Sequence, residues 1–520
     1  MSIIPFSEIP ADNLVPIFAV EINNERASKS GPMPWKNLLI GQAVGAVTGS
    51  TPDAEKKWRP NTDNTGKLVR IMEGDQADSL FGRGSQIALM AKNFLKNAPY
   101  MELYCLALAD EPVESGQSAD AGKATTTLTF VGPAAESGPL YLNIAGQAVT
   151  VTVIDTDTAA TIAGNVKAKI DSLVDLPVVA TVSSSVVTLT AKNKGAAGND
   201  IAIFLNFNEG EKTPNGVSIT EFASTDVVKL SGGSGDTEFS AENVGNLIEG
   251  TWFNAIAINQ GDDNTTTGNV AYIKDKLDER WTAMKQQTGV LFYCVGGDMT
   301  AEITAGNARN SQVICLPGLP DSPTAPCNIA AAVMGACAVS ALNDPALPLS
   351  NVAVKGVVAP KRAKRLGVTS RNAILKAGVA ALFVGDDGTV YLNRTVTTYK
   401  YKANDASDIS YRQLETVFTL SYLRWDWNNY LSGKYPRAKL APDGNEFGPG
   451  QVVMTPKKGM SELLSRYQDW MKMGLVQNFD LFRQNVVVEL DQNDPNALLF
   501  LAPANLIKQF FISKTLLQFE

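Results

Sequence analysis

Side chains that could perform chemistry are sparse in this sequence, and histidine is missing altogether. Histidine is the commonest general base and the commonest transition-metal ligand, so its absence excludes Ser-His and Cys-His catalysis. Two glycine-rich segments stand at 82–85 (Gly-Arg-Gly-Ser) and 231–235 (Ser-Gly-Gly-Ser-Gly). Neither has the spacing of a phosphate-binding loop. We interpret the first as a turn and the second as a linker.

Paired acids at 262–264 (Asp-Asp-Asn) and 386–388 (Asp-Asp-Gly) are the remaining candidates for a cation site. No further oxygen ligands follow at a recognisable spacing, so both pairs are interpreted as polar turns. The cysteines are odd in number and form no close pair: Cys105, Cys294, Cys315, Cys327 and Cys337. Their apolar surroundings indicate buried free thiols in a reducing compartment rather than a zinc site. We therefore expect no metal, no cofactor and no enzyme activity.

Length and composition describe a large folded protein. A chain of 520 residues corresponds to roughly three or four domains. Its net charge of −8 argues against a general nucleic-acid binder. The first residues lack the pattern of a signal peptide, and no apolar run is expected to reach the length of a membrane span. Synthesis in the cytoplasm without direct membrane insertion follows as the expectation.

The elements predict a multidomain α+β protein. Strands alternate with helices over 35–111 and again over 234–390, which indicates two parts of one α/β core with a partly parallel sheet. Between them, residues 112–233 are rich in Thr, Val, Ala and Gly and predict short strands around one helix, a β-rich domain inserted into the core. Residues 391–493 form a further domain with two long helices, and 479–490 reads as a strand or hairpin arm.

Both ends of the chain are apolar and extended in character. Residues 1–34 are interrupted by prolines, which leaves one alternating strand carried by Phe18, Val20 and Ile22. Residues 494–520 stay apolar almost to the last residue, with these side chains as the candidate strand: Phe510, Ile512, Leu516, Leu517 and Phe519. An unpaired apolar strand must find a partner. Each arm either completes its own sheet or is donated to a neighbouring subunit.

Two basic clusters stand out in an acidic chain. The first lies in a stretch without acidic residues, 345–385, and its candidate contact residues are Lys361, Arg362, Lys364 and Arg365. The second consists of Lys434, Arg437 and Lys439. Such clusters are either solvated surface or a contact surface for an acidic protein partner.

Several short motifs of the C-terminal third follow one another in an order and at spacings that can be compared with known families. They are 393–399 (Asn-Arg-Thr-Val-Thr-Thr-Tyr), 408–411, 419–424, 434–440 (Lys-Tyr-Pro-Arg-Ala-Lys-Leu), 447–451 and 494–498. Together with 9–12, 77–85, 97–100 and 328–332, they closely resemble the contractile tail sheath proteins of Mu-like bacteriophages. Residues 112–233 match least, and Arg371 stands where relatives are expected to carry an acid.

The resemblance implies a structural subunit of the phage tail. Sheath subunits stack as hexameric rings around a tail tube, exchange N- and C-terminal strands, and contract to drive the tube through the host envelope. The implied partners are other copies of the chain, the tail tube protein, and the baseplate and tail terminator proteins, with no nucleic acid. The basic residues named above then become candidates for tube-facing or inter-subunit contacts. The implied location is the virion tail, after assembly in the host cytoplasm.

Three alternatives remain open at this point. A sheath of a phage-derived bacteriocin or injection particle would share the same mechanics, and neighbouring genes would separate the two. A hydrolase or nucleotide-binding enzyme could use an α/β core, although histidine and a phosphate loop are both missing. An adhesin would rest on the β-rich domain alone, and a glycan- or cell-binding assay on residues 112–233 would test it.

Overall fold

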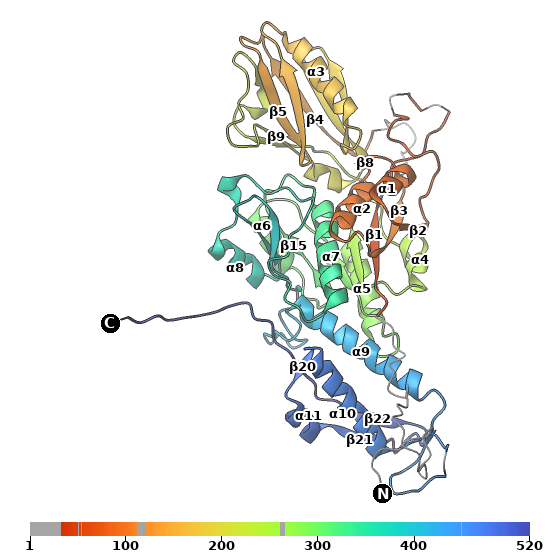
Figure 1. The fold of residues 1–520 in the computed structure, drawn as a ribbon. Helices are drawn as coiled ribbons and strands as arrows, with labels where there is room; N and C mark the ends of the chain where they lie inside the picture. The colour runs from red at the N-terminus through yellow and green to blue at the C-terminus, as the bar shows by residue number, and fades with distance from the viewer. Residues whose placement is uncertain are drawn as a thin grey trace, which may run out of the picture.

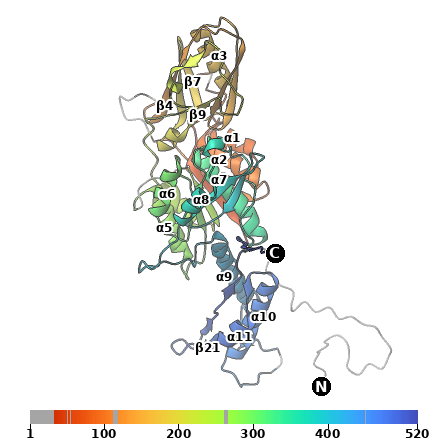
Figure 2. The same cartoon turned by 90° about the vertical axis from the view of Figure 1, so that its left-hand side faces the viewer.

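The computed structural model describes residues 33–49, 51–53, 55–111, 118, 120–259, 266–448 and 450–519. The described chain is elongated (Figure 1). A β-rich domain at the top stands on an α/β core, a smaller helical domain lies below, and the C-terminal residues project sideways as an extended arm. The same order of domains is visible after a quarter turn (Figure 2).

The core is built on a six-stranded, mostly parallel sheet. Its strand order is β14-β13-β12-β1-β3-β2, and only the edge strand β2 is antiparallel to its neighbour. The strands are β1 (Lys36–Gln42), β2 (Leu68–Ile71), β3 (Glu102–Leu108), β12 (Ala255–Ile258), β13 (Val290–Phe292) and β14 (Ile314–Cys315). The partly parallel sheet predicted from the sequence is confirmed. Strands β3 and β12 pair with the two sides of β1. The chain therefore leaves the sheet after β3, forms the inserted domain, and returns to the same sheet at β12.

Helices cover both faces of the sheet, as the alternation along β1 requires. Leu39 packs into the cluster that contains α2 and α7, whereas Leu38 and Ile40 pack into the cluster that contains α5. Ser85 accepts a hydrogen bond from the Ala88 N–H and caps α2. The helices are α1 (Gly74–Phe81), α2 (Gln86–Asn97), α4 (Asn246–Glu249, after the π-helix Ala241–Gly245), α5 (Asn269–Trp281) and α7 (Pro326–Asn343).

Helix α7 corrects one expectation. It is long and apolar enough, by length and composition, to cross a membrane, although no such run was expected. Most of its residues are buried, and it packs along α2 and against the sheet. A helix that is apolar all round is typical of a protein core as well as of a membrane. All five cysteines are free and buried, as expected, and Cys327 and Cys337 lie on this helix.

The core continues in a second, three-stranded sheet. It consists of β15 (Pro317–Gly318), β16 (Ala380–Val384) and β17 (Val390–Arg394), flanked by α6 (Met299–Asn307) and α8 (Val368–Lys376). Asp387 closes the β16–β17 turn by accepting from the Thr389 N–H and hydroxyl, so the predicted turn at 386–388 is confirmed. The other acid pair, 262–264, lies outside the described residues.

The inserted domain has a core of its own. Two four-stranded sheets, β10-β4-β8-β7 and β11-β9-β5-β6, enclose this core together with α3 (Ala159–Ser172). The strands are β4 (Lys123–Val131), β5 (Gly138–Ile144), β6 (Gln147–Val153), β7 (Val178–Ser183), β8 (Val186–Lys194), β9 (Ala202–Leu205), β10 (Ser218–Ile219) and β11 (Val227–Lys229), with 3-10 turns at Ala196–Asp200 and Thr220–Phe222. The segments that lead into and out of the inserted domain lie side by side: the Ser234 N–H donates to Gly122 O over 3.0 Å.

The C-terminal domain consists of helices and very small sheets. Its helices are α9 (Leu414–Lys434), α10 (Pro456–Lys472) and α11 (Phe479–Asn485). Three two-stranded sheets accompany them: β18 (Lys439–Leu440) with β19 (Val453–Met454), β20 (Val476–Gln477) with β23 (Asn505–Leu506), and β21 (Val487–Leu490) with β22 (Leu498–Leu501). The prediction of a strand over all of 479–490 is wrong in its first half. Residues 479–485 are helical instead, and this helix packs the ring of Phe482 against the ring of Tyr467 in the domain core.

Candidate assembly surfaces

A buried charge pair joins the two long helices of the C-terminal domain. Asp426 on α9 is 1% exposed and accepts from Arg466 Nε over 2.6 Å and from Trp470 Nε1 over 2.6 Å, both on α10. Around this pair, Leu423 and Tyr467 belong to the domain's apolar core. A charge that is paired and hydrogen-bonded from two sides holds the helices in one register. The α9–α10 pair is thus the rigid frame on which the small sheets sit.

The small hairpin β21–β22 lies on this frame with one face buried and one face exposed. Val488 and Phe500 are paired across the hairpin and turn inward, and Phe500 approaches Gly459 of α10 so closely that a Cβ there would lie 3.1 Å from its ring. Val487 and Leu501 are paired on the outer, exposed face. No third strand is paired with either edge among the described residues. An isolated two-stranded sheet is marginal, and its free edges can accept further strands.

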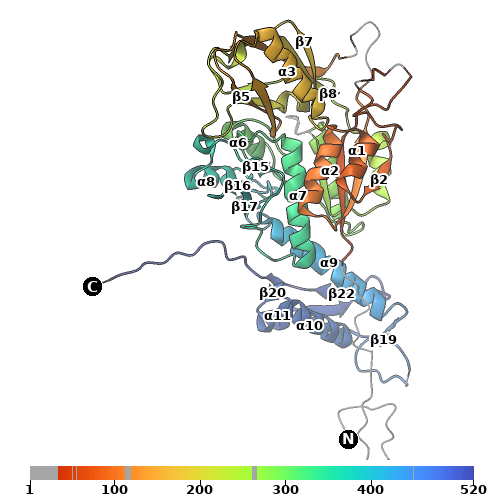
Figure 3. The ribbon, with the colours of Figure 1, turned by 45° about the horizontal axis from the view of Figure 1, so that its top comes forward.

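The apolar C-terminal stretch divides into a folded part and a free part. Its first residues complete β22 and β23 inside the domain, and Ile507 N–H donates to Leu475 O over 3.0 Å. Beyond this bond the chain leaves the body as an extended arm (Figure 1, Figure 3). Its apolar side chains face solvent, with exposures of 80, 64, 83, 84 and 93% for Phe510, Ile512, Leu516, Leu517 and Phe519.

Sequence reasoning identified the arm and predicted a strand or hairpin arm over 479–490, but it missed the pairing of that strand with 498–501. The signal was present as two short, largely apolar runs, 487–490 (Val-Val-Glu-Leu) and 498–501 (Leu-Leu-Phe-Leu), on either side of a turn that contains Asp494 and Pro495. The second run was assigned to the arm itself. Phe18, Val20 and Ile22, the expected N-terminal strand, lie outside the described residues.

The basic cluster of residues 434–439 is only partly available to a partner. Lys434 Nζ lies 2.7 Å from Glu462 Oε2, and Tyr430 and Tyr435 donate to the same carboxylate. Burial opposes the charge of Lys434, but its hydrogen bonds to Glu462 and Tyr430 prevail and raise its pKa. Arg437 and Lys439 are exposed, and among the described residues the Lys439 ammonium donates to the Gln451 amide oxygen, over 2.7 Å. Two of the three cations therefore remain available.

The cluster of residues 361–365 lies elsewhere, against the inserted domain. Lys361 Nζ pairs with Asp226 Oδ2 over 2.8 Å, and this hydrogen bond lowers the pKa of Asp226. Arg365 Nε donates to Pro360 O over 3.3 Å. Arg362 and Lys364, on a single 3-10 turn, are exposed. The structure thus separates the two basic clusters and uses part of each internally.

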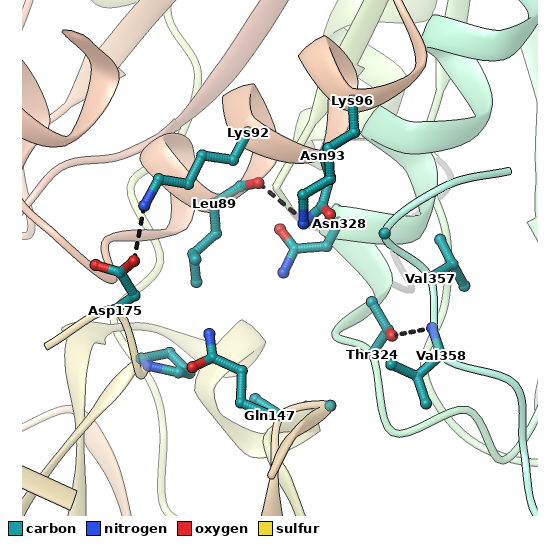
Figure 4. A pocket seen from close by; sticks show the side chains of 14 residues that line it. Leu89, Lys92, Asn93, Lys96, Gln147, Asp175, Thr324, Asn328, Val357 and Val358 are labelled. Atoms are coloured by element: carbon teal, nitrogen blue, oxygen red, sulfur yellow. Dashed lines mark hydrogen bonds and ion pairs between the residues drawn. The ribbon is translucent and has the colours of Figure 1, made fainter. Parts of the chain in front are cut away.

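The inserted domain meets the core through polar contacts around a cavity of about 330 Å³ (Figure 4). Asp175 of the inserted domain accepts from Lys92 of α2 over 3.0 Å and from Arg83 over 2.7 Å. Lys192 reaches back into the core and donates to Arg83 O over 2.9 Å, where burial lowers its pKa to about 7. The glycine-rich turn 82–85 therefore lies in the contact between the core and the inserted domain.

The cavity brings no catalytic group together. Figure 4 shows a lysine–aspartate pair and the amides of Asn93, Gln147 and Asn328, with no nucleophile placed against a base. No cluster of three metal-ligating side chains occurs in the part of the chain that the structure describes.

Comparison with known proteins points in the same direction. Residues 406–513 match the family described as the phage tail sheath C-terminal domain. The chain is 32% identical over 517 residues to the Mu-like prophage FluMu tail sheath protein of Haemophilus influenzae, covering 99% of both chains.

Solved structures resemble the chain more distantly. The sheath tail protein of Desulfitobacterium hafniense is 14% identical with a TM-score of 0.46, over 95% of this chain and 97% of that one. The sheath tail protein of Listeria innocua is 14% identical with a TM-score of 0.47, over 93% of this chain and 95% of that one.

Proposed function

This chain belongs to the phage tail sheath family, and from that premise we propose how its arms and surfaces build a contractile tail. The chain is a structural subunit of a contractile sheath and a component of the virion tail. In our proposal it stacks as hexameric rings around the tail tube and contacts the baseplate and tail terminator proteins. It catalyses no reaction. It is made in the host bacterial cytoplasm and drives the tube through the host envelope.

The observation that carries this proposal is the C-terminal arm. Beyond Ile507 it has no strand partner among the described residues, yet it keeps five large apolar side chains exposed. Exposed apolar surface of this extent marks a site of association. A neighbouring copy of the chain is the partner that a homopolymer supplies.

The β21–β22 hairpin is the acceptor that we propose for the donated strands. Asp491 N–H donates to Ala497 O, which makes alternate pairs of the ladder hydrogen-bonded. By this alternation, the N–H and C=O groups of Val488 and Phe500 point to the two open edges. One edge would receive the C-terminal arm of one neighbour, and the other edge the strand carried by Phe18, Val20 and Ile22 of another.

Strand addition suits a lattice that has to rearrange. Backbone hydrogen bonds join the arm to its acceptor and leave the two bodies free to rotate about the linking residues. The arm lies well away from the rigid domains, so the subunits can shift without releasing it (Figure 3). In our proposal the energy for contraction is stored in the extended lattice and no nucleotide is consumed.

Arm truncation tests this function. Removal of residues 512–520 should abolish tubes and stacked rings in negative-stain microscopy, because the donated strand is lost. The monomer should still fold, because these side chains are exposed. The matched control replaces the arm's polar residues Ser513, Lys514 and Gln518 by alanine and should polymerise normally. Tubes of normal length from the truncated chain would contradict strand donation.

Two cations of the second basic cluster remain candidates for the tube contact. Arg437→Glu and Lys439→Glu should weaken co-assembly with purified tube in sedimentation, but not tube-free polymerisation. Lys434→Glu is unsuitable for this test, because it would place two carboxylates together at Glu462. Arg362→Glu and Lys364→Glu serve as the comparison, since an inter-subunit role there would impair both kinds of assembly. Unchanged co-sedimentation of the 437/439 variant would exclude it from the tube contact.

A further inference from the structure

A groove of about 520 Å³ lies where the C-terminal arm leaves the body. Three cations line it, Arg394, Arg412 and Lys508, and the apolar side chains of Ile409, Leu506 and Phe511 complete its walls. No acidic residue is among the lining residues. A concave surface with this composition fits an extended segment that carries both carboxylates and apolar side chains.

The cations of the groove are positioned but not neutralised. Arg394 stacks on the ring of Phe511 with its guanidinium 4.6 Å from the ring centre, and its Nε donates to the Gln413 amide oxygen over 3.2 Å. None of the three cations forms an ion pair within the described residues. Two carboxyls lie close to Arg412 in sequence: Asp408 accepts from the hydroxyls of Tyr399 and Ser410, and Glu415 is fully buried and accepts from the Leu349 N–H. Burial raises the pKa of Glu415 to about 7, so much of this carboxyl is uncharged near neutrality.

Burial lowers the pKa of Arg394, which reflects the partial desolvation of its charge. A half-buried guanidinium with unused donors favours a carboxylate partner, because two N–H groups can bind both oxygens at once. Ile409, in the lining of the same groove, is 62% exposed. The apolar walls can therefore still bury side chains that flank the carboxylate.

The N-terminal segment of this chain has the complementary character. Its first 25 residues contain no Lys or Arg but four acids, Glu8, Asp12, Glu21 and Glu25. Glu8 and Asp12 stand among apolar residues and prolines, in the run 3–14 (Ile-Ile-Pro-Phe-Ser-Glu-Ile-Pro-Ala-Asp-Asn-Leu). Prolines at this density favour an extended chain. The segment lies ahead of the proposed donated strand at 18–22, and the exchange of that strand gives it no role of its own.

We propose that the N-terminal tip of a second copy, residues 3–14, docks in this groove, with Glu8 and Asp12 paired to Arg394, Arg412 and Lys508. The proposal rests on the strand exchange described above and adds a second attachment point to it. The 32 residues before Met33, fully extended, span on the order of 100 Å. A span of this length allows the tip to extend from its own subunit to a copy in contact with it. The groove would then link the N-terminal arm of one copy to the root of the C-terminal arm of another.

A labelled synthetic peptide of residues 2–16, titrated with the full-length chain in fluorescence anisotropy, tests the proposal directly. We expect saturable binding that weakens at least tenfold in Arg412→Glu and weakens with added salt. A peptide carrying Glu8→Lys and Asp12→Lys should bind the native chain poorly and bind Arg412→Glu at least tenfold better than the native peptide does. Lys376→Glu, a charge reversal at an exposed site on α8, is the matched control and should change nothing.

The readout separates this proposal from the function itself. Peptide binding is measured without polymerisation, whereas arm truncation at residue 512 leaves the groove in place and tests polymerisation. Failure of the native peptide to bind, or equal affinity of the native and reversed peptides, would overturn the groove proposal. Circular dichroism checks that the Arg412→Glu variant is folded. If it is not, Lys508→Glu, at an exposed site where the arm begins, replaces it in the same titration.

Discussion

The inserted domain and the C-terminal domain differ in how fully they pair their strands and bury their apolar side chains. The inserted domain closes two four-stranded sheets over one continuous core, and its large apolar side chains are largely buried. The C-terminal domain has three sheets of two strands each and an arm whose apolar residues face solvent. One region is complete as a single chain. The other has open strand edges and an apolar segment that no other described residue covers, which is the surface we propose for assembly.

This contrast indicates where stability and where assembly reside. Sheets of four strands with a shared core are stable by themselves, whereas a lone hairpin needs a supporting helix or an added strand. The C-terminal domain relies on the Asp426–Arg466 pair and the α9–α10 frame for its own stability. The inserted domain touches the core mainly through polar contacts such as Asp175 with Lys92. Substitutions in the two regions should therefore have separable effects.

The largest effect is expected at the buried pair of the C-terminal domain. Asp426→Ala removes the buried partner of Arg466 and leaves this largely buried charge only the exposed Asp469 carboxylate, 3.7 Å away, which should destabilise this domain by about 3–5 kcal/mol. Hydrogen exchange read by mass spectrometry should show faster exchange in α9 and α10 and no change in the inserted domain. The matched control is Asp469→Ala, which removes a solvent-exposed pairing 3.7 Å from the same arginine and should cost less than about 1 kcal/mol. Equal effects of the two variants would argue against the frame.

Glu415, in the first turn of α9, should make stability depend on pH. Burial raises its pKa from 4.5 to about 7 in the folded chain. The fold favours the neutral form of this carboxyl, so its contribution to the free energy of unfolding is fully present below the unfolded pKa of 4.5. That contribution is lost as the pH rises through the folded pKa of about 7. Compared with Glu415→Gln, the native chain should therefore lose up to about 3 kcal/mol between pH 4.5 and pH 8 in urea unfolding. A pH-independent difference between the two chains would contradict a carboxyl that ionises in the fold.

A smaller effect is expected where the inserted domain docks on the core. Gly84 has φ +75°, and a Cβ at this position would lie 2.4 Å from Leu176 O of the inserted domain. Gly84→Ala should destabilise the docked arrangement by about 2 kcal/mol in thermal unfolding. The comparison is Gly164→Ala, in the middle of α3, where an added Cβ would meet no other atom. This substitution should stabilise the inserted domain by about 0.5–1 kcal/mol. Tolerance of Gly84→Ala would indicate that the two domains do not hold the observed contact.

The smallest effect on the monomer is expected in the arm. Leu516→Ser combined with Leu517→Ser should leave the free energy of unfolding unchanged within about 0.5 kcal/mol, because both side chains are solvent-exposed. The same variant should shorten or abolish tubes in microscopy. Its counterpart in the inserted domain, Leu142→Ala, removes a buried side chain and should cost about 2–5 kcal/mol. Tube formation should survive that change at temperatures where the domain remains folded.

Local signals in the sequence predicted many elements well. Ser85 and Thr158 accept hydrogen bonds from the backbone three residues onward and begin α2 and α3, because capping depends only on neighbouring residues. The strand of β21 was predicted within the run 479–490, but its pairing with β22 was not, and the first half of that run is a helix in which Phe482 packs against Tyr467. That packing belongs to tertiary structure and leaves no period in the sequence.

By itself the sequence determined that the chain lacks the groups for catalysis by histidine, that a β-rich segment is inserted into an α/β core, and that the C-terminal end is apolar. Those properties follow from composition and local periodicity, which need no knowledge of contacts. Only the tertiary structure decided which part of the apolar end is folded and which is free, because strand pairing joins β22 to β21 and β23 to β20. It also decided which cations are used internally, since Lys434 and Lys361 meet Glu462 and Asp226 from distant parts of the chain.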